Sequence, residues 1–138
     1  MSSTSYKRID ATYNRPLGDR LVNAPIVRMN IQECIGQLKT EISWEQGDRN
    51  AITILHSDFQ RVVLVALKEG AEMKRYKVDG AMNIHLLNGR VWIESELQSF
   101  SVDESDIAAL EPGLSHSIFA EKESVLLLTF SGNSDGEF

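Results

Sequence analysis

The side chain with the widest chemical range in this sequence is His116, which follows a Pro112-Gly113 turn signal. Histidine titrates near neutral pH, so it can act as an acid or base, orient a ligand or bind a metal ion. Ser115 precedes it, but neighbours on a strand point to opposite faces and cannot act as nucleophile and base. Two interpretations stay open. His116 is a ligand-orienting pocket residue, or it fills space and hydrogen-bonds Tyr76 or the backbone.

A small basic group flanks Tyr76 and consists of Lys74, Arg75 and Lys77. A guanidinium group offers a rigid pair of donors to a carboxylate, so Arg75 is a candidate for recognising an anion. A solvated loop explains the same residues, and we favour that interpretation. Glu72 is assigned to the same loop between two strands.

The other histidines, the tryptophans and the single cysteine are expected to have structural roles. Cys34 lies on an apolar stripe and is expected to be a small buried hydrophobic residue rather than a redox thiol. His85 is expected to face outward, and His56 to be exposed beside a turn. Trp44 and Trp92 are expected to anchor packing. The sequence has no phosphate-binding glycine loop, no paired zinc cysteines and no Gly-x-Ser-x-Gly motif.

One helix is predicted ahead of the strands, over about residues 31–42. Its apolar residues recur every three or four positions, which gives a helix one buried stripe. Asn30 can cap the first turn, and Glu33 stands three residues later, in the spacing of a capping box. Gly36 weakens this helix by about 1 kcal/mol.

From Asn50 onward the sequence predicts about eight short strands separated by turn signals. The expected strands are 51–55, 61–67, 81–87, 90–94, 97–102, 107–110, 115–120 and 125–130. Residues 61–67 are nearly all apolar, as in a strand that is covered on both faces. Asn88-Gly89 is a strong hairpin signal, because both residues tolerate a positive φ. Regular spacing of strands and turns favours a sandwich or a barrel over an α/β fold.

A chain of 138 residues fits one domain, which we place at residues 25–130, with the barrel at about 50–130. Residues 1–24 are polar and aperiodic and are interpreted as an N-terminal arm, either loose or packed on a partner subunit. Residues 131–138 are predicted to be a flexible tail.

The charge balance excludes some partners. The chain has 20 acidic and 14 basic residues, for a net charge of -6. This field repels phosphate backbones and anionic membrane surfaces, so we expect no nucleic acid and no membrane as partner. No run reaches the roughly 18 apolar residues of a membrane span, and the first residues lack the apolar part of a signal peptide. With a single cysteine and no intramolecular disulfide, these features predict a cytoplasmic protein.

Three segments together resemble the cupin family. They are residues 68–91, in which a strand ends at Gly70 and an Asn-Gly turn follows, residues 106–116 (DIAALEPGLSH), and residues 123–130 (ESVLLLTF). This pattern is similar to small one-domain bacterial cupins (RmlC-like) of unassigned function. The resemblance implies an all-β fold, the double-stranded β-helix or jelly-roll barrel, here with one short N-terminal helix. It also implies a pocket inside the barrel and a homodimer, since small cupins commonly pair through an outer sheet face.

The first cupin motif is only partly present in this chain. Its two glycines correspond to Gly70 and Gly89. The position of its first histidine is Tyr76, that of its second histidine is Val78, and that of its glutamate is Met82. Three of the metal ligands that the family pattern implies are therefore replaced.

The second cupin motif is better preserved. Ser105 stands at the position of its opening glycine, Pro112 and Gly113 match, and Ala120 replaces its closing asparagine. His116 matches the remaining metal ligand, so it alone is left of the four that the resemblance implies. A divalent ion normally needs at least three protein ligands, and we therefore expect no metal and no other cofactor.

The replacements outline a predicted pocket, made of residues that strand alternation or the cupin pattern assigns to the barrel interior. These residues are Tyr76, Val78, Met82, Ile84, Leu86, His116 and Ile118. An apolar cavity with a few polar tips is typical of a small-molecule site. A filled core explains the same residues, because small barrels pack their interiors with side chains.

Three hypotheses follow, in this order. The first is a non-catalytic protein that binds a small apolar or weakly anionic ligand in a metal-free barrel. The second is a structural or interaction homodimer whose pocket is vestigial. The third is a metal-dependent enzyme with an irregular site built on His116 and Tyr76.

Overall fold

The computed structural model describes residues 8–9, 20–76 and 78–131, and at residues 8–9, 20–21 and 75–76 the description covers the backbone alone. In chain order the elements are β1 (Arg8–Ile9), β2 (Arg20–Leu21), α1 (Ile31–Leu38), α2 (Ile42–Gln46), β3 (Arg49–His56), β4 (Gln60–Leu67), β5 (Glu72–Tyr76), β6 (Met82–Asn88), β7 (Arg90–Ser95), β8 (Ser99–Asp103), β9 (Ile107–Leu110), β10 (His116–Ala120) and β11 (Ser124–Ser131). Most of the predicted arm, and the predicted tail after Ser131, lie outside the described residues.

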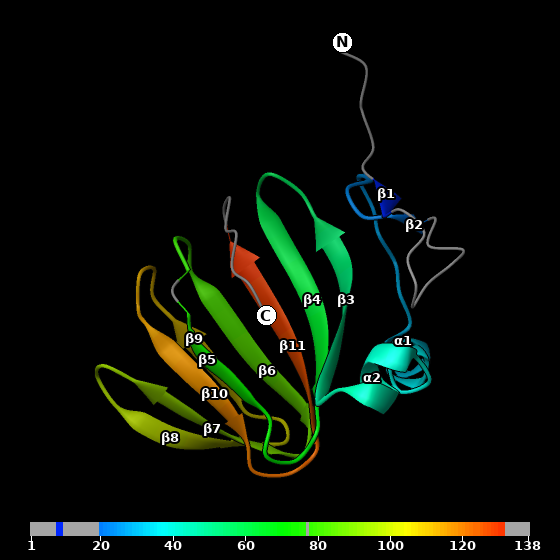
Figure 1. Ribbon diagram of the computed structural model, residues 1–138. Coiled ribbons are helices and arrows are strands. Elements are labelled where there is room, and N and C mark those ends of the chain that lie inside the picture. The colour runs from blue at the N-terminus through cyan, green and yellow to red at the C-terminus, as the bar shows by residue number, and fades with distance from the viewer. Residues whose placement is uncertain (1–7, 10–19, 77, 132–138) are drawn as a thin grey trace.

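Two antiparallel sheets form the body of the molecule (Figure 1). The five-stranded sheet has the order β3-β4-β11-β6-β9, and the four-stranded sheet has the order β5-β10-β7-β8. The chain crosses repeatedly from one sheet to the other, as in a jelly roll. This arrangement confirms the predicted all-β fold.

The two sheets enclose one apolar core. Met82, Ile84 and Leu86 alternate along β6 with more exposed residues and are at most 1% exposed, which confirms their predicted inward orientation. Ile118 joins them from β10 and is fully buried. Fully burying an aliphatic side chain of this size contributes about 1.5–3 kcal/mol to folding.

The predicted helix is two helices rather than one. Its start is as expected, because the Asn30 side chain accepts a hydrogen bond from the Glu33 amide at 2.9 Å. Its end is not, because Glu41 adopts an extended conformation between α1 and α2. The Asn50 side-chain amide donates to the Leu38 carbonyl at 3.0 Å and to Glu41 Oε1 at 2.8 Å. A strand residue therefore satisfies the end of α1, and the helix does not continue.

The helices pack on the outer face of the five-stranded sheet, beside β3 in Figure 1. Cys34, Leu38 and Trp44 are buried there against Ile52 and Leu64, so the structural roles expected for Cys34 and Trp44 are confirmed. The ammonium groups of two lysines lie within 6 Å of the Trp44 ring centre, at 5.1 and 5.8 Å. Neither described helix has the length and apolar character needed to cross a bilayer.

Two short stretches of strand were not predicted. Residues 72–76, expected to be a loop, form β5 at the edge of the four-stranded sheet, with a bulge opposite residues 116–118 of β10. Among the described side chains of this segment, Met73 is the one apolar residue facing the core, so its sequence carries little alternation. Within the expected arm, β1 and β2 pair antiparallel over two residues each.

The turns follow the predicted signals closely. Gly89 has a φ of 92° between β6 and β7, which confirms the Asn-Gly hairpin, and a Cβ atom there would collide with Glu123 and Ser124. Ser105 also has a positive φ, 74°, at the position where the cupin pattern has a glycine. It is the one non-glycine residue with a positive φ in the part of the chain that the structure describes.

Candidate functional site

The predicted pocket residues lie together, but inside a packed core. Val78, Met82, Ile84, Leu86, His116 and Ile118 are all buried, with exposures from 0 to 4%. The side chains of Tyr76 and Arg75 lie outside the described residues, although the Tyr76 backbone pairs with that of His116 in the β5–β10 ladder. The interior therefore corresponds more closely to the filled-core interpretation at these positions.

His116 is held by its own strand end. Its Nδ1 atom lies 3.1 Å from the Leu114 carbonyl oxygen. A carbonyl oxygen can only accept, so Nδ1 carries the proton and Nε2 has the lone pair of the neutral ring. Burial lowers the pKa of His116, and the hydrogen bond to Leu114 opposes this shift only in part. The ring is therefore neutral at pH 7 and fixed in one tautomer.

The positions that the cupin pattern assigns to metal ligands do not fit a divalent ion. Val78 has no donor atom and lies in the apolar cluster with Met82, whose thioether is a weak, soft ligand. His116 supplies one nitrogen. Among the described residues, no three His, Cys, Asp or Glu side chains gather closely enough to hold a metal ion. The donor set disagrees with the metal chemistry of the family pattern.

A cavity of about 630 Å³ lies elsewhere, between the free edges of the two sheets. β8 ends the four-stranded sheet and β9 ends the five-stranded sheet, and no ladder joins them. The cavity is lined by Ser95, Glu96, Leu97, Gln98, Phe100, Ile107, Ala108, Ala109, Leu110, Glu111, Pro112, Gly113 and Leu114. These residues come from the β7–β8 turn, the start of β8, β9, and the loop that follows β9.

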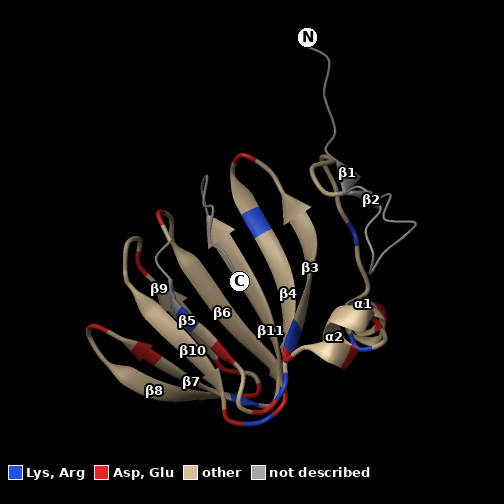
Figure 2. Ribbon diagram, in the orientation of Figure 1, with Lys and Arg blue, Asp and Glu red and all other residues tan. Residues whose placement is uncertain are grey.

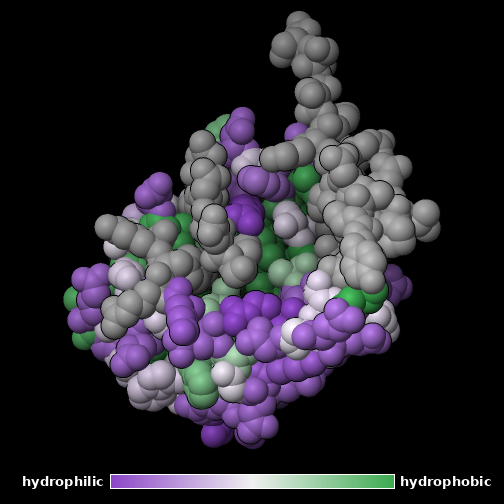
Figure 3. All heavy atoms as spheres, viewed as in Figure 1, coloured by the Kyte–Doolittle hydropathy of each residue, from purple (hydrophilic) through white to green (hydrophobic). Residues whose placement is uncertain are grey.

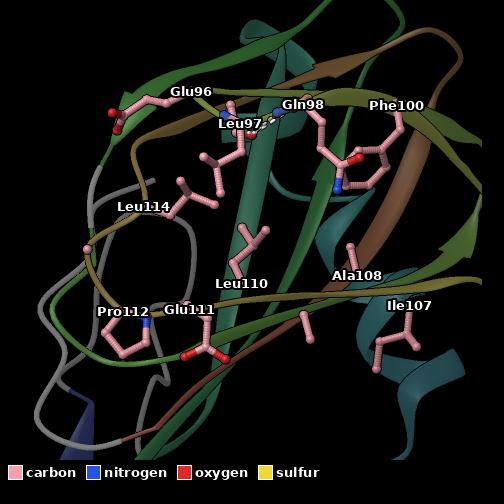
Figure 4. A pocket seen from close by; sticks show the side chains of 13 residues that line it. Glu96, Leu97, Gln98, Phe100, Ile107, Ala108, Leu110, Glu111, Pro112 and Leu114 are labelled. Carbon is pink, nitrogen blue, oxygen red and sulfur yellow. Dashed lines mark hydrogen bonds between the residues drawn. The ribbon is translucent and has the colours of Figure 1, made fainter.

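The apolar side chains of the cavity converge. Figure 4 shows Leu97, Leu110 and Leu114 pointing toward one another across the opening. The carboxylates of Glu96 and Glu111 turn away from it. Glu96 accepts a hydrogen bond from the Ser115 amide at 3.3 Å, which ties the β7–β8 turn to the start of β10. The cavity thus has an apolar interior and an acidic rim.

The predicted pocket forms the wall behind this cavity. Leu110 pairs with Met82 across β9 and β6, and Ser95 pairs with His116 across β7 and β10. Leu114 both lines the cavity and binds the His116 ring. None of the six predicted pocket residues whose side chains the structure describes lines the cavity itself. Leu97, predicted within the strand 97–102, lies in the turn before β8 (Ser99–Asp103), and Leu114 lies in the loop after β9.

Arg61 on β4 is partly buried, which the sequence pattern did not indicate. Figure 2 shows most charged residues in the loops, whereas Arg61 is the one charged residue of β4 (QRVVLVAL). Its guanidinium carbon lies 5.7 Å from the ring centre of Phe130, a core residue, and its Nε is inaccessible to solvent. His56 pairs with Arg61 in the ladder and is half-buried, so its expected exposure was wrong.

Hydrophobic residues also reach the surface near this part of the barrel. Figure 3 shows them gathered in a hollow over β4 and β11, while hydrophilic residues dominate the rest of the visible face outside that hollow.

Two further residues point outward from the barrel. His85 alternates with inward residues of β6 and faces outward, as expected. Trp92 was expected to anchor packing, but it is 37% exposed on the outer face of β7.

The comparisons with known proteins bear on the fold. No protein-family model and no curated protein sequence matches the chain. A cupin superfamily protein from Desulfitobacterium hafniense superposes with a TM-score of 0.63 at 18% identity, over 81% of this chain and 97% of that one. A conserved protein of unknown function from Streptococcus pyogenes gives 0.60 at 20% identity, over 63% and 76%. An RmlC-like cupin from Shewanella frigidimarina gives 0.59 at 15% identity, over 62% and 78%.

These similarities, together with the sheet topology, establish a cupin fold for this chain. They confirm the resemblance inferred from the sequence. At such identities the likeness concerns the fold alone, because one fold hosts many functions.

Proposed function

We propose that this cupin-fold chain is a non-catalytic protein that binds a small, mostly apolar molecule in the cavity between β8 and β9. One observation carries the proposal. Three leucines from separate segments converge on one opening, and Leu97 is 81% exposed there. When a ligand removes water from an apolar side chain in a concave site, the free energy falls, which favours binding.

The size and charge of the cavity narrow the ligand class. A volume of about 630 Å³ lies within the usual range for small-molecule sites, roughly 300–1,000 Å³. Among the described residues, the lining includes Glu96 and Glu111 and no Lys, Arg or His. An acidic rim favours a neutral or amine-bearing ligand over the weakly anionic one considered from the sequence.

Two features support binding over metal-dependent catalysis. The cupin ligand positions at Val78 and Met82 offer no hard donor. His116 is neutral and bound to a backbone carbonyl, so it is suited to fixing the β9–β10 loop behind the cavity.

A fluorescent apolar amine tests the proposal. We expect N-phenyl-1-naphthylamine to brighten on binding the full chain, with saturation at one site. Leu97→Asp places a carboxylate in the apolar opening and should weaken binding at least about tenfold, equivalent to 1.4 kcal/mol. Phe59→Asp is the matched control, because Phe59 is 83% exposed in the β3–β4 turn, away from the cavity lining. Equal loss in both variants, or no saturable binding, would refute the proposal.

Metal analysis of freshly purified, untagged protein separates the metal-dependent alternative. We expect substoichiometric metal that does not change in His116→Ala. Near-stoichiometric metal that is lost in this variant would replace the binding proposal with a metal site that uses His116.

A further inference from the structure

The polar residues that line the cavity differ in which of their groups are left for a ligand. The Ser95 hydroxyl donates to the Gln98 carbonyl at 2.7 Å and accepts from the Gln98 main-chain amide at 3.2 Å, so these groups close the β7–β8 turn. The Glu96 carboxylate accepts from the Ser115 amide. The Gln98 side chain, in contrast, makes no hydrogen bond with another described residue. An uncharged donor and acceptor are therefore left at the opening.

Strand parity directs the Gln98 carboxamide into the cavity. Phe100 and Val102 on β8 face the core between the sheets, and Gln98 has the same parity just before the strand. The Ser95 amide donates to the Gln98 carbonyl at 3.1 Å and extends the β7–β8 ladder by one step, so the alternation reaches Gln98. Figure 4 shows the carboxamide directed into the opening from the same turn as Leu97. The apolar opening thus contains a group that offers hydrogen bonds without a charge.

The opposite wall of the cavity also offers uncharged groups. The Leu86 amide donates to the Asp106 carbonyl at 3.2 Å, which fixes the phase of hydrogen bonding between β6 and β9. In that phase Ala108 bonds to Ile84, because hydrogen-bonded pairs recur at every second residue of an antiparallel ladder. The N–H and C=O groups of Ala109 therefore point the other way, to the free edge of β9 that borders the cavity. A ligand between the sheet edges meets peptide groups here as well.

We propose that the ligand of this cavity carries an uncharged amide beside its apolar body and exchanges a pair of hydrogen bonds with Gln98. This inference rests on the proposed function and names the ligand class within it. A carboxamide presents its N–H and C=O side by side, so a primary or cyclic amide can accept from one group and donate to the other. A carboxylate only accepts and an ammonium only donates, so each leaves one group of Gln98 without a partner.

The charges of the rim oppose both ionic alternatives. The negative field of Glu96 and Glu111 raises the free energy of a bound carboxylate. An ammonium at Gln98 loses water without gaining a salt bridge, because both carboxylates turn away from the opening in Figure 4 and Glu96 is bound to Ser115. An amide has less hydration to lose and keeps both hydrogen bonds. The neutral ligand is therefore favoured over the amine-bearing one.

A matched set of naphthalenes tests this ligand class. 2-Naphthamide, 2-naphthoate and 2-naphthylmethylammonium share one apolar body and are neutral, anionic and cationic at neutral pH. Each is titrated against the full chain with bound N-phenyl-1-naphthylamine, and displacement of the dye is measured. We expect 2-naphthamide to displace the dye at a concentration at least about fivefold lower than either ion, as one additional neutral hydrogen bond predicts.

Two variants of Gln98 separate recognition from packing. Gln98→Leu removes the donor and the acceptor, so it should weaken 2-naphthamide at least about fivefold and should not weaken naphthalene itself. Gln98→Glu replaces the donor with a negative charge and should reverse the order of the amide and the ammonium. Gln32→Leu is the matched control, because Gln32 is exposed on α1 and does not line the cavity, and it should leave every affinity unchanged.

The outcomes distinguish this inference from the proposed function. Displacement by all three probes at similar concentrations, or an unchanged order in Gln98→Glu, would overturn the amide class and leave the apolar site in place. Equal weakening of naphthalene and 2-naphthamide in Gln98→Leu would assign Gln98 to packing and would overturn it too. Absence of saturable dye binding would overturn the proposed function and this inference together.

Discussion

The two sheets of this barrel differ in how many of their faces are covered. The five-stranded sheet is buried on its inner side by the core between the sheets, and α1 and α2 cover its outer side over β3, β4 and β11. Among the described residues, the four-stranded sheet is covered on its inner side alone, and Trp92 and Phe119 are partly exposed on its outer side. The cavity opens where the free edges of these two unequal sheets meet.

This difference is visible in single strands. β4 has five consecutive buried residues, Val63–Leu67, because one parity faces the core and the other faces the helices. β7 alternates strictly between exposed and buried positions, because only one parity is covered. The apolar pattern of a strand thus indicates whether one or both faces of the sheet are covered at that strand. The surfaces left for recognition are on the side where the pattern alternates.

The largest expected effect tests the doubly covered sheet. Leu64 on β4 is fully buried under the helices. Leu64→Ala should lower the free energy of unfolding by about 2–5 kcal/mol, because it leaves a cavity that the helices cannot close. Leu97→Ala, an exposed leucine on the four-stranded side, should change it by less than about 0.5 kcal/mol. Urea denaturation measures both, and similar losses would contradict the difference in coverage.

A smaller effect tests what holds the helices on that sheet. Asn50 donates to the Leu38 carbonyl and to the buried carboxylate of Glu41. Asn50→Ala leaves both acceptors short of a donor and should cost about 1–3 kcal/mol. Asn83→Ala changes an exposed asparagine on β6 of the same sheet and should be nearly neutral. The same denaturation curves compare the two variants, and a neutral Asn50→Ala would mean that apolar contacts alone seat the helices.

The features that local patterns predicted are those that local physics determines. The alternation of apolar and polar residues predicted which side chains of β6 face the core, and the Asn-Gly pair predicted the turn at Gly89. Each of these features depends on a few adjacent residues. The Asn30 cap is local in the same sense. The cupin resemblance added the topology, which alternation alone does not specify.

The features that were missed depend on contacts between distant segments. The break after α1 requires Asn50 from β3, and the strand state of β5 requires pairing with β10. Trp92 was assigned to the core from its residue type, although its parity on β7 placed it outside. The cavity arises from where two sheet edges end, so no single segment of the sequence predicts it.

A third prediction concerns the inner face of the singly covered sheet, where His116 titrates. Burial lowers its pKa below the ordinary value of 6.5, so the unfolded chain binds the proton more tightly. Stability should be full above pH 6.5 and should fall as the pH drops from 6.5 toward the folded-state pKa, by at most about 1.4 kcal/mol per pH unit. His116→Asn should remove this component of the pH dependence. Unfolding curves between pH 5 and 8 measure it, and an unchanged slope in the variant would assign the effect to another group.

The smallest prediction lies at the junction of the two sheets and has the opposite sign. Ser105 connects β8 of the four-stranded sheet to β9 of the five-stranded sheet with a φ of 74°. An L-residue in this conformation carries roughly 1–2 kcal/mol of strain that glycine avoids, although glycine gives up part of the gain through its greater freedom when unfolded. Ser105→Gly should therefore raise the free energy of unfolding by up to about 1 kcal/mol. Ser105→Ala keeps the Cβ atom and should give no such gain, so thermal unfolding of the pair isolates the backbone term. Equal stability of the glycine and alanine variants would show that the junction relaxes without cost, and that the sheet edges around the cavity are not fixed by this turn.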